Sequence, residues 1–135
     1  MLEGVIMNVL CFMGDKINKN IKYFLPNTVL FSNEKERITV TMIKEALDYI
    51  LGIIAIQNPL VESYKTAKAV FSAMKMILEN KKPSRPSKTD MKTTVDVLEE
   101  ITNLSAKSEW EKEQNARYAF LCKLMIDGFG EKVQS

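Results

Sequence analysis

The feature that most constrains the fold is an uncharged run of 13 residues, 49–61, near the middle of the chain. Within it, residues 51–56 carry no strongly polar side chain. A helix that is apolar on every side is either enclosed by protein or placed in a membrane. A membrane span needs roughly 20 apolar residues, and Pro59 interrupts this run. We therefore expect a buried central helix over about residues 42–57, wrapped by amphipathic segments.

Amphipathic patterns on both sides of this run predict further helices. The clearest lies in residues 59–80, where apolar residues recur in alternating steps of four and three. Ser87 and Ser108 each precede an acidic residue by three positions, which matches the capping boxes that open helices. The expected helices cover residues 2–13, 15–25, 42–57, 59–80, 88–103 and 109–127.

The segments between these helices read as loops. Two prolines and two serines exclude a helix from residues 81–88, the one evident exposed linker. Residues 27–33 include three consecutive apolar side chains, but no partner strand is evident, so we expect an ordered loop docked on the core. A helical turn is expected at residues 34–37. The β-branched side chains of residues 38–40 are less favourable in a helix, so either the central helix starts late or this stretch is extended.

Together these patterns predict an all-α fold in one domain, residues 1–135. We expect a single compact bundle of five to six helices around the central apolar helix, with little or no sheet. A chain of this length can bury a core without disulfides or metal. Gly128 is expected to end the last helix, and residues 129–135 to form a frayed tail.

The composition excludes many catalytic and metal sites. Histidine is absent, which removes Ser-His and Cys-His catalysis and histidine-ligated metals. Five scattered glycines form no phosphate-binding motif. Glu109 and Glu113 could present paired oxygens to a cation, but acids in a first helical turn also complement the helix dipole, and we adopt this second interpretation. We therefore expect no catalytic residue, metal, cofactor or small-molecule substrate, and no enzyme activity.

The remaining composition bears on compartment and source. Cys11 and Cys122 lie among apolar neighbours, which favours two buried reduced thiols over a disulfide. No basic signal-peptide region precedes the apolar N-terminal residues, so we expect an intracellular protein, cytoplasmic or, if viral, in the host cytoplasm or nucleus. With 16 Lys, 12 Ile and 9 Asn, the composition suits an AT-rich genome such as that of a virus, phage, mobile element or low-GC bacterium.

Positive charge is concentrated in residues 58–92, which hold eight basic and three acidic residues in a chain of net charge +2. One interpretation is contact with nucleic-acid phosphates or another acidic partner. The alternative is a solvated connector whose lysines complement a helix C-terminus. Binding of single-stranded nucleic acid would favour aromatic residues among the basic ones, but no aromatic residue interleaves with this cluster. The candidate binding residues are Lys65, Lys68, Lys75, Lys81, Lys82, Arg85, Lys88 and Lys92.

Aromatic side chains are the candidates for contact with a protein partner. Trp110, the only tryptophan, lies at the edge of the last apolar stripe, so core packing is the default interpretation and interface contact the alternative. Further candidates are Tyr118, Tyr64 and Phe71. A partner could bind in a groove between amphipathic helices, or the chain could self-associate along residues 60–78.

Two function hypotheses follow. The first is a small, non-catalytic interaction or regulatory protein, an adaptor, inhibitor or effector that binds a protein partner or itself. The second is a nucleic-acid-binding helical module, or a subunit of a nucleoprotein complex, that uses the basic residues of segment 65–92. The sequence favours the first, because the basic segment is the whole support for the second.

Overall fold

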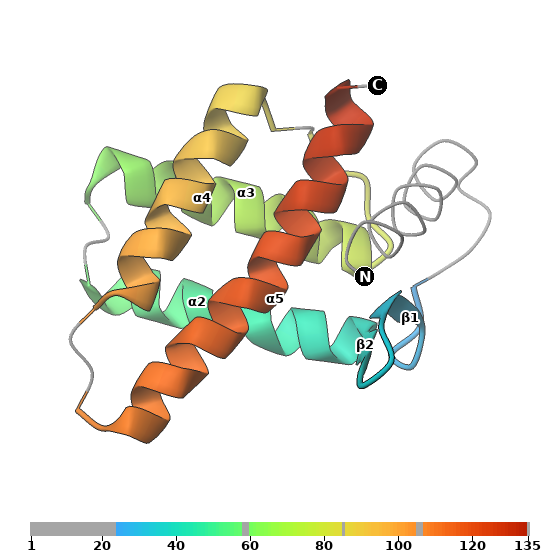
Figure 1. Cartoon of the computed structure of the whole chain (residues 1–135). Coiled ribbons are helices and arrows are strands. Elements are labelled where there is room, and N and C mark those ends of the chain that lie inside the picture. The colour runs from blue at the N-terminus through green and yellow to red at the C-terminus, as the bar shows by residue number, and fades with distance from the viewer. Residues whose placement is uncertain (1–23, 58–59, 85, 105–106, 135) are drawn as a thin grey trace.

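The computed structural model describes residues 24–57, 60–84, 86–104 and 107–134, with side chains described up to Gly128 (Figure 1). These residues form a short hairpin followed by four helices. The elements are β1 (Val29–Ser32), β2 (Arg37–Thr39), α2 (Val40–Gln57), α3 (Glu62–Leu78), α4 (Lys88–Thr102) and α5 (Glu109–Gln134). The all-α class and a minimal sheet are confirmed.

The helices pack in two layers. α2 and α3 form the rear layer in Figure 1, and α4 and α5 cross in front of them. α4 packs mainly on α3 and on α5, and α5 also packs on α2, so the four helices close around one core. Its largest fully buried side chains include Ile43, Ile50, Tyr64, Phe71, Ile101 and Met125.

The expected number of helices needs correction. The described residues contain four helices, not five to six. The expected helix 2–13 and most of 15–25 lie outside the described residues, while Phe24 and Leu25 are described and are not helical. α3 begins at Glu62 rather than at residue 59, and Leu60 is 84% exposed instead of packed inward.

α2 is one wall of the bundle, not its enclosed centre. Its buried residues are Val40, Ile43, Ala46, Leu47, Ile50 and Ile54. The opposite side is exposed; Gly52 and Ala55 lie there, and at the end of the helix Ile56 is 81% exposed. The expectation of burial on every side is therefore wrong. Of the exposed positions in the uncharged run, Gly52 and Ala55 are small, whereas Ile56, Leu60 and Val61 are larger apolar side chains.

The expected loop at residues 27–33 and the expected helical turn at 34–37 are wrong, because this segment folds as a β-hairpin. The expected docking of its apolar residues on the core is confirmed, since Leu30 and Phe31 are buried. β1 and β2 are antiparallel, with Phe31 opposite Ile38. The Asn33 side chain accepts hydrogen bonds from two turn amides, each at 2.8 Å, which fixes the turn. Of the β-branched residues 38–40, the first two lie in β2, so the extended alternative is confirmed for them, while Val40 begins α2. Glu36, in the turn, pairs with Arg117 of α5.

Both serine caps are confirmed, and one helix end is not. The Ser87 hydroxyl accepts a hydrogen bond from the Asp90 amide at 3.0 Å, and the Ser108 hydroxyl accepts one from Glu111 at 3.1 Å. α5 passes through Gly128 and continues to Gln134, so Gly128 does not end it. Within the described residues, no helix combines the length and apolar character that a bilayer crossing needs.

Candidate functional site

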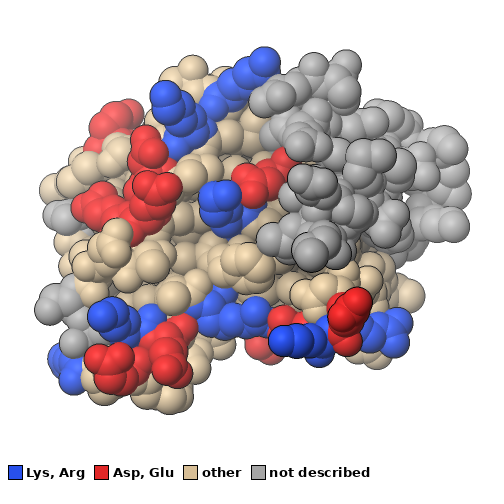
Figure 2. All heavy atoms as spheres, viewed as in Figure 1, with Lys and Arg blue, Asp and Glu red and all other residues tan. Residues whose placement is uncertain are grey.

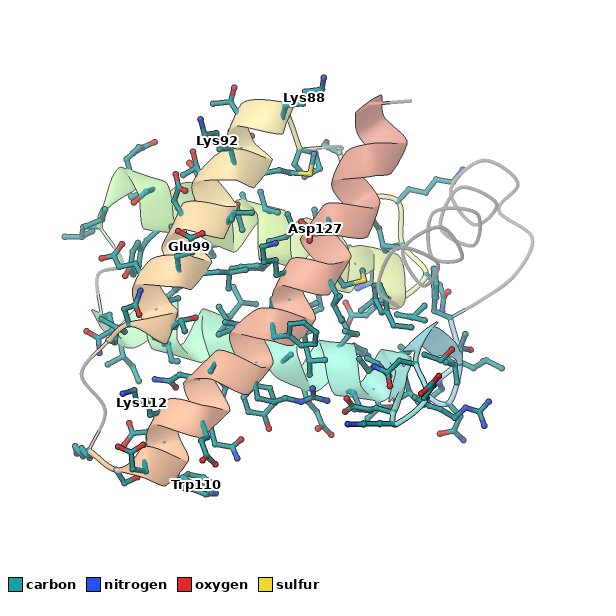
Figure 3. The ribbon with its side chains drawn as sticks, viewed as in Figure 1. Lys88, Lys92, Glu99, Trp110, Lys112 and Asp127 are labelled. Carbon is teal, nitrogen blue, oxygen red and sulfur yellow. The ribbon has the colours of Figure 1, made fainter. Side chains whose placement is uncertain are left out.

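The candidate basic residues are spread along the molecule. Lys65 and Lys68 are exposed on α3, Lys82 is exposed in the loop after it, and Lys88 and Lys92 are exposed at the start of α4 (Figure 3). Since a helix rises about 1.5 Å per residue, the 17 residues of α3 alone separate its two ends by about 25 Å. Arg85 lies outside the described residues.

Two of these lysines already have carboxylate neighbours. Lys75 donates to Asp48 of α2 at 2.7 Å, and this hydrogen bond raises the pKa of Lys75. Lys81 lies 3.9 Å from Glu79. Lys65 and Lys68 lie one turn apart on α3, Lys88 and Lys92 lie one turn apart on α4, and the other described candidates lie later on α3 and in the loop after it. Their role in binding stays a prediction.

Three of the four aromatic candidates belong to the interior or its margin. Tyr64 and Phe71 are buried in the core. Tyr118 is half-buried and its ring lies 4.4 Å from that of Tyr49, whose hydroxyl donates to Asn115 at 2.5 Å. Burial, and then nearby Glu111, raises the pKa of Tyr49. These contacts join α2 to α5.

Trp110 is 69% exposed, so its default interpretation as a core residue is wrong. The first six residues of α5 are exposed or half-exposed, because this end of the helix extends beyond α2 (Figures 1 and 3). Trp110 lies in that projecting end, outside the length of helix that packs on the bundle. Contact of Trp110 with a partner stays a prediction.

The described residues contain no group of three or more His, Cys, Asp or Glu side chains that could hold a metal ion. Cys122 is a buried free thiol, and burial raises its pKa well above the ordinary value. A buried, protonated thiol is a poor nucleophile. Cys11 lies outside the described residues.

An apolar groove lies between α4 and α5, the two front helices of Figure 1. Its volume is about 330 Å³, at the lower end of the range for ligand pockets. The groove is an open depression and not an enclosed cavity. Its lining is largely aliphatic and aromatic, and includes Val95, Leu98 and Thr102 from α4 and Ala116, Ala119 and Phe120 from α5.

Two small side chains of α5 and two polar side chains bonded to their own helix shape part of the groove. Ala116 and Ala119 contribute only methyl groups from α5. The Thr102 hydroxyl donates to the Leu98 carbonyl at 2.8 Å, and the Asn103 amide donates to the Glu99 carbonyl at 2.9 Å. These polar groups are satisfied by their own helix, which leaves the apolar part of the lining available.

Phe120 is the lining residue with the largest apolar side chain, and it is 40% exposed. The sequence pattern places it on the apolar face of the last helix, but the structure leaves it at the groove edge. Buried Leu98 and Ala119 lie deeper. The groove thus offers an apolar base and an aromatic edge to a binding partner.

No protein-family model, curated protein or solved structure matches the chain. Function is therefore inferred from the surface of the chain itself. The groove was not predicted from the sequence, although a signal was present. Ala116 and Ala119 are three residues apart, so they share one helical face and leave little side-chain volume on it.

Proposed function

We propose that this protein acts by binding a partner protein, and that the α4–α5 groove receives an amphipathic helix of that partner. The observation that supports this proposal is the open apolar groove of about 330 Å³ with half-exposed Phe120 at its edge. Helices recognised in grooves insert apolar anchors spaced three and four residues apart. A groove that runs between two helices offers room for such a row of anchors.

Shape favours a helix over a small molecule. Sites for small ligands surround most of the ligand surface, whereas this groove is open on one side. An amphipathic helix needs burial on one face only. Its polar face would remain in water while its anchors replace solvent above Leu98 and Ala119.

Nucleic-acid binding is the less supported function. Its candidate lysines lie along α3, in the following loop and on α4, and Lys75 already pairs with Asp48. Phosphate contacts gain affinity by adding charges along one surface. Retention of the protein on DNA at about 50 mM salt would restore this hypothesis, because electrostatic binding is strongest at low salt.

The proposal is tested by selection from a displayed library of helical peptides with random residues around an apolar stripe. We expect the selected peptides to lose roughly tenfold or more in affinity for the Phe120→Glu variant, a change of about 1.4 kcal/mol. Ala116→Glu, at another exposed lining position, is expected to act in the same direction.

Ser72→Glu is the matched control, because Ser72 is exposed on α3 and does not line the groove. We expect it to leave binding unchanged. Circular dichroism should show that all three variants retain their helix content. Peptides that bind the groove variants as well as the wild type, or a library that yields no binder, would overturn the proposal.

A further inference from the structure

The charges beside the groove differ between its two walls. On the α4 side, Asp96 and Glu99 are exposed and three residues apart, and Glu99 lines the groove itself (Figure 3). Glu100, the next residue of α4, interacts with Tyr64 of α3 and does not line the groove. Figure 2 shows the corresponding acidic side chains gathered over α4, with uncharged surface between them and α5.

The α5 side carries both signs. Lys123 lines the groove and pairs with Asp127 at 3.1 Å, while Lys112 and Glu113 lie one turn before Ala116. Charges of opposite sign on one wall largely cancel at a distance. On α4, Lys92 lies one turn before Val95, so this wall is acidic only in its second half, at Asp96 and Glu99, and that stretch sets the charge preference of the groove.

Glu99 lies in the last turn of α4, where its own helix disfavours an acid, and Asp96 lies one turn earlier. The C-terminal end of a helix carries a partial negative charge, so acids in the last turn are unfavourable and cations are favourable. α4 has no basic residue in its last turn. Within the described part of the chain, neither Asp96 nor Glu99 forms an ion pair. A cation supplied by a partner would relieve this repulsion.

We propose that the helix received by the groove is cationic on one flank, with Lys or Arg side chains placed along Asp96 and Glu99. This inference rests on the proposed function and specifies the chemistry of the partner. The apolar stripe of the partner helix covers the groove, and its basic flank lies over α4. The opposite flank meets the mixed charges of α5 and has no strong preference.

The test uses the same displayed library, with the flanking residues read from the selected peptides. We expect Lys and Arg to be enriched on one flank and Asp and Glu to be depleted there. Selection on the Asp96→Lys, Glu99→Lys double variant should invert this preference. Because charges at an interface edge act mainly on association rate, the double variant should also slow association of the basic peptides by roughly tenfold at low salt.

The matched control is Glu45→Lys with Glu62→Lys, which reverses two exposed acids of α2 and α3 that do not line the groove. This control should keep the original preference. Peptides that depend on Phe120 but show no flank preference would overturn the charge inference and leave the proposed function standing. Peptides indifferent to Phe120, or no binder at all, would overturn both.

Discussion

At the scale of single residues, Asn80 shows how one side chain can end a helix and anchor a distant segment. Its backbone has a φ of 65°, and the amides of Asn80 and Lys81 donate to Ile77 and Met76, which closes α3 in a Schellman motif. Its side chain also accepts a hydrogen bond of 2.6 Å from the Phe24 amide. Asparagine suits this position because it tolerates the left-handed region better than most residues.

Substitutions at Asn80 separate these two roles. Asn80→Ala should lose both the backbone tolerance and the side-chain acceptor, and lower the free energy of unfolding by about 1–3 kcal/mol. Asn80→Gly keeps the backbone freedom and loses only the acceptor, so we expect a smaller loss. Urea denaturation measures both values. A glycine variant at least as unstable as the alanine variant would contradict this account.

Tyr64 makes stability depend on pH in the alkaline range. Burial, followed by the nearby Glu100 carboxylate, raises the pKa of Tyr64 above its ordinary value of 10.0. Since the unfolded chain loses this proton first, the stabilisation is complete below about pH 10 and declines as the pH rises through the folded-state pKa. Urea denaturation between pH 9 and pH 11 should therefore show that the free energy of unfolding falls less steeply with pH in Tyr64→Phe than in the wild type. The two slopes should differ by at most about 1.4 kcal/mol per pH unit. Equal slopes in both proteins would contradict the pKa assignment.

At the scale of elements, α2 allows a matched comparison of its two sides. Ile50 is fully buried and Ile56 is 81% exposed. Ile50→Ala should cost about 2–5 kcal/mol of unfolding free energy, the usual range for a large-to-small core change. Ile56→Ala should change it by no more than about 0.5 kcal/mol. Denaturant unfolding of both variants is the measurement, and similar losses would contradict the placement of α2 as a wall.

The sequence predicts helices better than it predicts the pairing of strands. Ser87 and Ser108 are local signals, and the helices they open begin where expected. The hairpin was missed because the partner of Phe31 is Ile38, and the stretch that contains Ile38 was equally compatible with a helix start. Gly128 does not end α5 because its backbone stays helical: among the described residues no glycine adopts the positive φ that commonly closes a helix.

At the scale of the whole molecule, the candidate site depends on two helices that meet only after folding. The spacing of Val95 and Leu98 places them on one face of a helix, but it does not show which residues of α5 lie opposite. Ala116 and Ala119 make the groove only because they face α4. The basic segment, in contrast, is conspicuous in the sequence, and the fold spreads its residues along α3, a loop and α4.

The central claim is that partners bind between α4 and α5. Its most direct test is a solution NMR titration of the isotopically labelled protein with a peptide selected from the helix library. We predict that the largest amide shift changes lie in residues 95–102 of α4 and 116–123 of α5, with little change along the exposed side of α3. Shift changes centred on α3 and the loop at residues 81–84, with the groove unaffected, would contradict it.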